Sequence, residues 1–379
     1  MKKILFVTND FGPRAGGIES FIIGLVERLP SATVTVFTSS QGETSHYDAM
    51  WLEDYGVTVI RDRSKMMLPT PRVARALKKI IHEERFSVAC FGAAAPLGLL
   101  ASTLRRAGVT RIISLTHGHE VWWAKVFPFN LVIHRIGQSV DALTYLGDFT
   151  KRNISAALSP KARESMVRIA PGIDTAHFHP DAAPSKLRSE LGLSGKSVIV
   201  SVGRLVPRKG QDRLIQALPL IRSTIHDAHL LLVGEGSYRR ALEKLVEEEK
   251  VKDHVTFVGR VPYNQLPEYF RCGDIFAMPS RSRIAGLEVE GLGIVYLEAS
   301  ASGLPVIAGN SGGAPDAVVD GVTGIVVDGT NINAIAAAIV RVLSDPAKQK
   351  AMGAVGIEWV ASSWSWEIWS EKFAQLLGI

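Results

Sequence analysis

The chain has 379 residues, of which 46% are hydrophobic and 21% charged, with only two cysteines. This length exceeds a single typical core and suits two domains, and the composition is that of an ordinary globular protein. Cys90 and Cys272 lie far apart in apolar segments. They disfavour a disulfide framework or a cysteine metal site and favour a reducing, cytoplasmic compartment.

The formal net charge of +6 is unevenly distributed along the chain. Residues 1–180 hold 22 Lys and Arg against 15 Asp and Glu, or +7, which leaves −1 for the remainder. Such an excess can attract an anionic membrane surface, although solubility alone also explains it. No nucleic-acid-binding signature accompanies the charge. Residues 1–10 are typical of a first strand, not a signal peptide, and the longest apolar window, 88–101, is too short to span a bilayer.

Strand-like apolar segments alternate with amphipathic helical ones through the first half of the chain. Helices are predicted at 18–29 and 70–84. This alternation favours a parallel sheet covered by helices on both faces. The predicted strands of this half are 3–8, 33–39, 57–61, 87–92, 111–117, 142–147 and 167–172.

The same pattern begins again after residue 196, which predicts two doubly wound α/β domains. The first covers 1–172 and the second 173–363, with a helix at 364–379 packing back on the first. Ligands of such sheets bind beyond the carboxyl ends of the strands, so we expect a site in a cleft between the domains. The strands predicted for the second domain are 197–203, 229–235, 255–260, 275–280, 305–310 and 324–328.

A glycine pair follows the first predicted strand, in NDFGPRAGGIESF. Gly16 and Gly17 lead into a helix predicted to start near Ile18. The free N–H groups of a helix N-terminus, approached over glycines, suit a phosphate. A tight turn explains the pair equally well, because the segment is neither G-x-G-x-x-G nor a Walker A loop.

A basic cluster follows the first strand of the second domain, in GRLVPRKG. Arg204, Arg208 and Lys209 crowd a strand–helix junction, where like charges repel unless an anion lies between them. The position beyond a strand end favours an anion site over a solvated basic loop. Gly234, in GEGSY after the next strand, is a weaker candidate for the same edge.

The segment THGHE places His117, His119 and Glu120 at the end of a first-domain strand, where they are expected to face the site. The H-x-H spacing suggests a metal, but no further cluster with metal-ligand spacing accompanies it, so no metal is predicted. Histidines that hydrogen-bond substrate hydroxyls are favoured instead. Arg281 and Arg283, in MPSRSR, are expected on the site face of the second domain.

Two glutamates, Glu290 and Glu298, lie on either side of Gly291 and Gly293. If the segment from about Gly293 is helical, they lie roughly 12 Å apart along the axis and cannot act as one pair. Carboxylates accept hydrogen bonds from vicinal hydroxyls, and the helix N-terminus suits phosphate. The spacing favours a nucleotide sugar, with Glu290 on the sugar and Glu298 on the ribose. A helix start followed by a solvated glutamate is the plainer alternative.

The segment VWWAKVFPF, residues 121–129, joins two tryptophans and further large apolar residues to Lys125. Such a segment can enter lipid headgroups or line a lipid acceptor groove. Buried core is an equal alternative.

Several motifs in order resemble the retaining glycosyltransferases of family 4, over nearly the whole chain. They are the glycine pair, GRLVPRKG, VGEG, Glu290-x7-Glu298, GLPVIAGNSGGAPD and GVTGIVVD. That family has the GT-B fold of two Rossmann-like domains that face a central cleft. VTNDFGPRAGGIESF, LTHGHE and EVEGLGIVYLEA are similar to its phosphatidylinositol monomannoside α-1,6-mannosyltransferases, which use GDP-mannose at the cytoplasmic face of the membrane.

The resemblance implies a role for each matching residue. The implied catalytic group is Glu290, His117, Arg204 and Lys209, and guanine would lie along the backbone near Arg260. Further implied nucleotide-sugar contacts are Gly16, Gly17, Gly234, Val261, Gly291, Leu292, Gly293, Ile294 and Glu298, and Asn9, Asp10, His119 and Arg283 are implied as acceptor or secondary contacts.

The resemblance also implies the reaction. A hexosyltransferase would move mannose from GDP-mannose to a phosphatidylinositol monomannoside, adding the second mannose by an α-1,6 bond with retention in glycolipid biosynthesis. Cations and helix N-termini would stabilise the departing GDP in place of a metal, with no cofactor. The implied location is the inner face of the plasma membrane, where the basic N-terminal half would contact anionic lipid.

Two other functions stay open. A transferase of the same fold could use another nucleotide sugar or a soluble glycan, and liposome sedimentation would separate it from a lipid enzyme. A nucleotide-sugar-binding or epimerase-like protein without transfer activity is disfavoured by the presence of both glutamates and the paired basic residues. A dehydrogenase is disfavoured because no complete G-x-G-x-x-G follows a strand.

Overall fold

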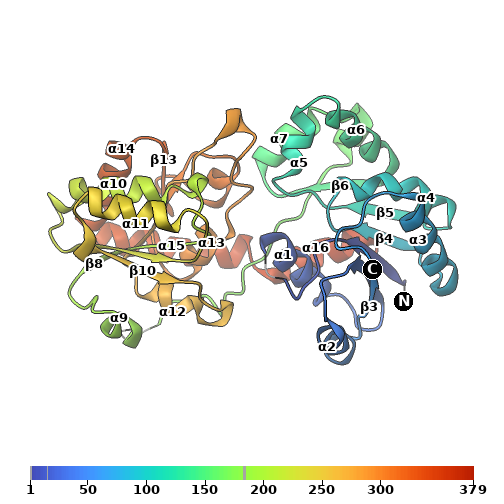
Figure 1. The fold of residues 1–379 in the computed structure, drawn as a ribbon, viewed down its shortest axis with the longest axis horizontal. Coiled ribbons are helices and arrows are strands. Elements are labelled where there is room, and N and C mark those ends of the chain that lie inside the picture. Colours follow the sequence, from blue (N-terminus) through green and yellow to red (C-terminus); the bar gives the residue numbers. More distant parts are fainter. Residues whose placement is uncertain (1, 15, 182–184) are drawn as a thin grey trace. The chain divides into compact units, whose positions relative to one another are not determined.

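The computed structural model describes residues 2–14, 16–181 and 185–379 (Figure 1). The chain divides into two compact units. Unit 1 is Met1–Gly172 with Trp366–Ile379, and unit 2 is Ile173–Ser365. Each unit contains one parallel sheet and is described by itself.

Unit 1 contains a seven-stranded sheet with the order β3-β2-β1-β4-β5-β6-β7. All of its neighbouring strands are parallel, from the β1–β2 pair to the short β6–β7 pair. Every strand predicted for this half is present, although β5, β6 and β7 each end at least two residues earlier than predicted. The strands are β1 Ile4–Thr8, β2 Val34–Ser39, β3 Thr58–Asp62, β4 Val88–Phe91, β5 Arg111–Ser114, β6 Ala142–Tyr145 and β7 Val167–Arg168.

Helices cover both faces of this sheet. Successive side chains of a strand point to opposite faces, so Leu5 and Val7 of β1 join the core beneath α3 and α4. Phe6, between them, faces the other way and contacts Phe373 of α16, with ring centroids 6.0 Å apart. The helices are α1 Gly17–Val26, α2 Ser45–Tyr55, α3 Pro71–Glu84, α4 Ala101–Arg106, α5 Glu120–Lys125, α6 Phe129–Ser139, α7 Asp148–Ser155, α8 Pro160–Glu164 and α16 Trp366–Leu377, with the 3-10 turn η1 Leu97–Leu100.

The C-terminal tail is helical, as its amphipathic pattern predicts. Its first residue, Trp366, stacks near Phe21 of α1 with ring centroids 6.4 Å apart. Arg28 lies over the same indole, 4.6 Å from the ring centroid. The end of the chain therefore completes the core of unit 1, and Figure 1 shows α16 beside α1.

Unit 2 contains a six-stranded parallel sheet with the order β10-β9-β8-β11-β12-β13. Each strand predicted for this half is present. This doubly wound arrangement in both units confirms the predicted fold class. The strands are β8 Ser197–Val202, β9 Ala228–Val233, β10 Val255–Gly259, β11 Ile275–Met278, β12 Val306–Gly309 and β13 Gly324–Val327.

Helices α10, α11 and α14 form one core with this sheet (Figure 1). On the other face, Phe276 of β11 contacts Phe270 of α12 and Tyr296 of α13, with ring centroids 5.9 and 5.8 Å away. The helices are α9 Lys186–Glu190, α10 Gln211–Arg222, α11 Arg239–Glu248, α12 Leu266–Arg271, α13 Ile294–Ala301, α14 Ile332–Leu343 and α15 Pro346–Ser363, and the 3-10 turns are η2 Pro207–Lys209, η3 Lys252–His254, η4 Tyr263–Gln265, η5 Ile284–Gly286 and η6 Ala314–Ala317.

Candidate active site

The basic cluster of unit 2 is held against the end of strand β11. The turn η2 closes at Gly210, whose φ of +80° lies in the left-handed region. A Cβ at Gly210 would lie 2.1 Å from the carbonyl oxygen of Pro279, so a side chain there would push the turn away. Close packing at Gly210 places Arg208 and Lys209 beside the segment that leads from β11 to Glu290.

Glu290 lies between the two cations of this cluster. Its Oε2 atom is 2.6 Å from Nη1 of Arg208 and 2.8 Å from Nζ of Lys209. The sequence indicated that an anion should separate these like charges, and the chain itself supplies that anion. Both Lys209 and Glu290 are buried, so the three groups form a desolvated ion cluster at the carboxyl edge of the sheet.

The charges of this cluster are coupled. Burial favours the neutral form of Glu290, but Lys209 and Arg208 outweigh it and hold the pKa of Glu290 below its usual value. Burial, with a smaller effect of Arg208, lowers the pKa of Lys209, and Glu290 opposes that shift. Glu290 is therefore an ionised carboxylate, suited to accept hydrogen bonds from sugar hydroxyls.

The second glutamate, Glu298, lies inside helix α13, which begins after Gly293. Gly293 has a φ of +83°, and a Cβ there would lie 2.4 Å from the ring of Tyr296. Burial raises the pKa of Glu298 to about 7, and Lys209 opposes the rise. The charge of Lys209 therefore acts on both glutamates, and the free N–H groups at the start of α13 lie between them in sequence.

The remaining predicted residues of unit 2 follow strand ends but differ in exposure. Arg204, after β8, and Arg260, after β10, have exposed side chains, and Val261 is half-buried. Gly234 follows β9 so closely that a Cβ there would lie 2.1 Å from the Gly203 carbonyl oxygen. These residues line the same carboxyl edge as the ion cluster.

Arg281 and Arg283 were expected to face the site, but both are committed elsewhere. Arg281 forks onto Asp212 through two contacts of 2.8 Å. Arg283 pairs with Glu288 at 3.0 Å and also exchanges backbone hydrogen bonds with it. Both cations are therefore already paired with a carboxylate of unit 2.

His117 in unit 1 lies beyond the end of β5, not within it as predicted. Its Nε2 atom is 2.7 Å from the carbonyl oxygen of Gly92, which can only accept, so Nε2 carries the proton. Burial lowers the pKa of His117, and Glu120 opposes the shift. The imidazole is therefore neutral near pH 7, and Nδ1 is the nitrogen left to accept a hydrogen bond.

Glu120 was expected to face the site beside the two histidines, and this is wrong. Its side chain is fully buried. The carboxylate accepts hydrogen bonds from the backbone N–H groups of His117 at 2.7 Å and Ala94 at 3.2 Å. It also lies 3.2 Å from Nε2 of His119. Glu120 fixes the loops that carry the histidines.

A cavity of about 240 Å³ is lined by three of the predicted residues of unit 1, Asn9, Asp10 and His119. The amide of Asn9 exchanges hydrogen bonds with the backbone of Met67 at 3.1 and 2.7 Å, so it also shapes the wall. The lining residues are Asn9, Asp10, Arg14, Ile18, Lys65, Met66, Ala93, Ala95, Pro96, Leu97 and His119.

The polar side of this cavity carries charges of both signs. Burial, followed by the negative charge of Glu19, raises the pKa of Asp10. Arg14 contacts Glu19 at 2.8 Å and Asp10 at 3.5 Å. These groups adjoin helix α1, which begins at Gly17 after its N-cap Gly16, so the predicted phosphate site of unit 1 is lined by a cation that is already paired.

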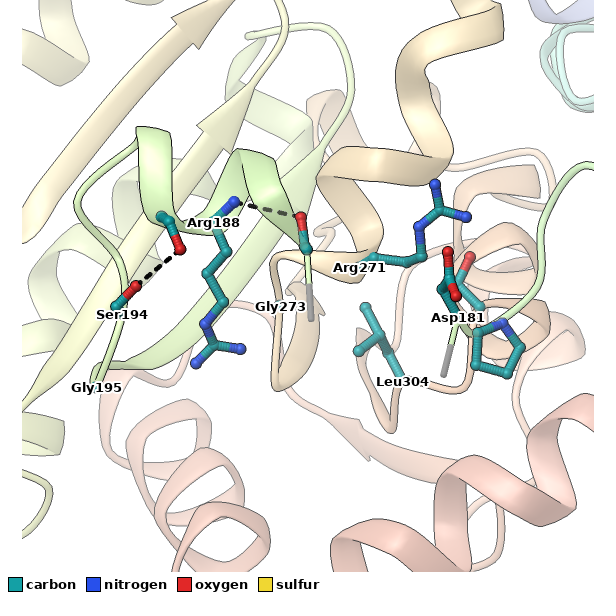
Figure 2. A pocket seen from close by; sticks show the side chains of 11 residues that line it. Asp181, Arg188, Ser194, Gly195, Arg271, Gly273 and Leu304 are labelled. Carbon is teal, nitrogen blue, oxygen red and sulfur yellow. Dashed lines mark hydrogen bonds between the residues drawn. The ribbon is translucent and has the colours of Figure 1, made fainter. Parts of the chain in front are cut away.

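A larger cavity, of about 560 Å³, lies elsewhere on unit 2 (Figure 2). Gly195, Gly273 and Leu304, which line it, precede β8, β11 and β12. It therefore lies at the amino edge of the sheet, opposite the ion cluster. The Arg188 guanidinium that lines it already pairs with Asp274 at 2.8 Å.

The aromatic segment of unit 1 is partly core and partly surface. Val121 and Ala124 of α5 are buried, which supports the core alternative for that helix. Phe127 is 75% exposed and Leu131, one turn into α6, is 57% exposed. Lys125 and Arg135, also exposed, form no ion pair with another described residue. We call Lys125, Phe127, Leu131 and Arg135 the α5–α6 surface.

Two features are absent from the described residues. No helix in residues 2–14, 16–181 and 185–379 is long and apolar enough to cross a membrane. Within the same ranges, no group of three or more His, Cys, Asp and Glu is placed to hold a metal ion.

Sequence reasoning did not foresee Lys65 and Arg14 as cavity residues or the pairing of Arg208 with Glu290. Lys65 lies shortly after β3, and the rule that ligands bind beyond strand ends could have identified it. The pairing of Arg208 joins segments far apart in the chain, so no local pattern could have indicated it.

Comparison with known proteins agrees with the motifs. Residues 185–359 match "Glycosyl transferases group 1", and residues 15–177 match "Glycosyltransferase Family 4". A GDP-mannose-dependent alpha-(1-6)-phosphatidylinositol monomannoside mannosyltransferase of Mycolicibacterium smegmatis is 43% identical, with 99% of this chain and 98% of the relative covered. A GDP-mannose-dependent monoacylated alpha-(1-6)-phosphatidylinositol monomannoside mannosyltransferase of Corynebacterium glutamicum is 42% identical, with 99% of this chain and 98% of the relative covered.

Solved structures share the fold at lower identity. HepE of Anabaena in complex with UDP has a TM-score of 0.84 at 19% identity, with 99% of both chains covered. Sucrose-phosphate synthase of Thermosynechococcus elongatus has a TM-score of 0.79 at 24% identity, with 99% of this chain and 98% of that chain covered.

Proposed function

This chain belongs to glycosyltransferase family 4, and on that premise we propose that it transfers mannose from GDP-mannose to a phosphatidylinositol monomannoside. The predicted enzyme class, a hexosyltransferase, is confirmed by this membership. The proposed product carries a second mannose in α-1,6 linkage, formed with retention and without a metal. One structural observation carries the proposal: the buried cluster of Glu290, Lys209 and Arg208 at the carboxyl edge of the unit 2 sheet.

The donor is proposed to lie along that carboxyl edge. Glu290, ionised by its cations, would accept hydrogen bonds from mannose hydroxyls, and Glu298 would take the ribose. Arg204 and Lys209 would hold the diphosphate together with the free N–H groups at the start of α13. Guanine would lie near Arg260 and Val261, whose backbone follows β10.

Transfer breaks the bond between the anomeric carbon of mannose and the phosphate oxygen, which leaves negative charge on the departing GDP. Positive groups that the fold has already desolvated stabilise such charge strongly, and Lys209 is of that kind. Arg204 would add a second, exposed cation. We propose same-face attack, in which the acceptor hydroxyl forms the new bond to the anomeric carbon. The proton of that hydroxyl then passes to the leaving phosphate oxygen.

The acceptor headgroup is proposed to bind in the 240 Å³ cavity of unit 1. An inositol phosphodiester has one negative charge and several hydroxyls. Lys65, which has an exposed side chain and no ion pair with another described residue, suits the phosphate. Asp10 and His119 suit the hydroxyls.

A lipid acceptor requires contact with a membrane surface. The α5–α6 surface combines two exposed apolar side chains with two cations, the combination that suits an anionic lipid interface. Between residues 121 and 163 the sequence holds six Lys and Arg, namely 125, 135, 151, 152, 161 and 163, against Asp141 and Asp148. We propose that the α5–α6 surface of unit 1 contacts lipid headgroups.

The proposal is tested by analysing the product. Purified protein is incubated with GDP-mannose and phosphatidylinositol monomannoside in detergent, with and without EDTA, and the lipid is examined by mass spectrometry and NMR. The expected product is a dimannoside whose new bond is α-1,6, with the anomeric configuration of the donor retained. It should form equally well in the presence of EDTA. A product on a soluble glycan only, or activity from another nucleotide sugar only, would replace this acceptor or donor.

A further inference from the structure

Arg208 has no role in the reaction as described above, yet it makes the shortest contact to Glu290. Its guanidinium lies 2.6 Å from Glu290 Oε2, the same oxygen that Lys209 approaches at 2.8 Å. The three side chains are 18%, 9% and 10% exposed for Arg208, Glu290 and Lys209. Among the described residues, no hydrogen bond reaches the other oxygen, Oε1. Both cations thus contact the same carboxylate oxygen.

The backbone of Arg208 is also fixed. Its carbonyl oxygen accepts a hydrogen bond from the N–H of Arg281 at 2.8 Å. Arg281 in turn is held by its fork onto Asp212. Both ends of the segment 281–290 therefore rest on Arg208, one through its carbonyl and one through its guanidinium. A side chain anchored in this way can hold Glu290 in one place.

The charges in the cluster explain why two cations are present. A diphosphate brings negative charge to Lys209, and a single cation cannot serve both the phosphates and a buried carboxylate without leaving one of them poorly compensated. Arg208 can neutralise the charge of Glu290 when Lys209 leaves this carboxylate and contacts the phosphates. Resting on the proposed function, we propose that Arg208 is a positioning residue that holds Glu290 for the sugar and thereby releases Lys209 for the diphosphate.

Other groups that face Glu290 cannot replace Arg208. Tyr296, from α13, has its hydroxyl committed to the carbonyl of Met278 at 2.8 Å and to Ser280 at 3.0 Å. Glu298, on the same helix, is itself acidic and supplies no positive charge. Without Arg208, the carboxylate of Glu290 would retain Lys209 and compete with the phosphates for it.

A double-mutant cycle on GDP binding tests this competition. Calorimetry compares wild type, Arg208→Gln, Glu290→Gln and the double variant, with Arg208→Lys as a charge-conserving control. We expect Arg208→Gln to weaken GDP binding by about five- to tenfold, a typical coupling within one ion network. The double variant should bind GDP as Glu290→Gln does, because the competing carboxylate is gone. Arg208→Lys should recover most of the affinity.

Each other outcome overturns the inference in its own way. An equal loss of GDP affinity from Arg208→Gln in the Glu290→Gln background would mean that Arg208 contacts the phosphates directly. No loss in the wild-type background would mean that Lys209 needs no release. If the wild-type protein binds no GDP, the proposed function itself fails, an outcome that the wild-type measurement alone identifies.

Discussion

The ammonium group of Lys209 lies 2.8 Å from the carboxylate of Glu290, and both groups are buried at the carboxyl edge of the unit 2 sheet. The contact joins the turn after β8 to the segment after β11, which are neighbouring strands. It places a cation suited to phosphate beside a carboxylate suited to hydroxyl groups. In a nucleotide sugar the diphosphate is bonded directly to the sugar, so neighbouring groups of these two kinds suit such a ligand.

Replacing Glu290 should separate sugar transfer from nucleotide binding. In Glu290→Gln, the amide cannot provide the ionised acceptor that the sugar requires, so transfer should fall by at least about 100-fold. GDP binding should persist, since Lys209 is released from its partner. Transfer assays and GDP calorimetry check this, with Glu248→Gln on the exposed side of α11 as control. Equal losses of transfer and GDP affinity would contradict the assignment of Glu290 to the sugar.

Replacing Lys209 should weaken the nucleotide itself. Lys209→Ala removes a buried cation from the proposed diphosphate site, and GDP affinity should drop by roughly tenfold or more, the scale of a desolvated charge contact. Lys244→Ala, which removes an exposed lysine paired with Glu248, is the matched control and should bind GDP normally. Unchanged GDP affinity in Lys209→Ala would show that this lysine only neutralises Glu290.

The buried Glu298 should make stability depend on pH. Its pKa of about 7 in the folded protein exceeds the ordinary value of 4.5, so between these values the folded state binds more protons than the unfolded state. Stability from this group therefore falls as pH rises from 4.5 to about 7 and is then constant. Glu298→Gln removes this pH-dependent loss, so it should raise the free energy of unfolding by up to about 3 kcal/mol above neutral pH.

Thermal unfolding of wild type and Glu298→Gln, across this pH range, measures the effect. The variant should melt higher than wild type at about pH 8, and the gap should close toward the acidic end, where wild-type Glu298 is protonated. Glu248→Gln, on the surface of α11, should show no such trend. A gap that stays constant with pH would mean that Glu298 does not titrate in this interval.

Membrane contact should depend on the α5–α6 surface. The double substitution Phe127→Ser with Leu131→Ser removes apolar area that a membrane would cover, so sedimentation with vesicles of phosphatidylcholine and phosphatidylinositol should fall. Binding by the wild type should also fade with added salt, because Lys125 and Arg135 contribute by charge. Leu220→Ser, at a 44% exposed position on α10 of unit 2, is the control. Sedimentation of the double variant equal to wild type would exclude this surface.

The fold was predictable because each strand is a short apolar run between turn residues. Segments such as 197–203 and 305–310 appear as β8 and β12 with ends shifted by one residue. Strand β7 was predicted at 167–172 but pairs over only two residues, since pairing partners, not apolarity, decide where a strand ends. Local pattern thus gives the elements and tertiary contact gives their limits.

The candidate site was predictable only in part. Glycines and cations after strand ends are local signals, and they located Lys209, Glu290 and Gly293. The partners of these residues depend on contacts between distant segments, so the pairing of Arg281 with Asp212 and the burial of Glu120 could not be read from spacing. Charged residues in one short motif, such as MPSRSR, can serve the stability of a loop as well as a ligand.

The most direct test of the account is GDP release from GDP-mannose by the purified protein, with and without phosphatidylinositol monomannoside in detergent. Glu290→Ala serves as the inactive control. A lipid mannosyltransferase should release GDP rapidly only when the lipid is present, with a dimannosylated lipid as product and no release by the variant. Release at the same rate without the lipid, or by Glu290→Ala, would contradict it.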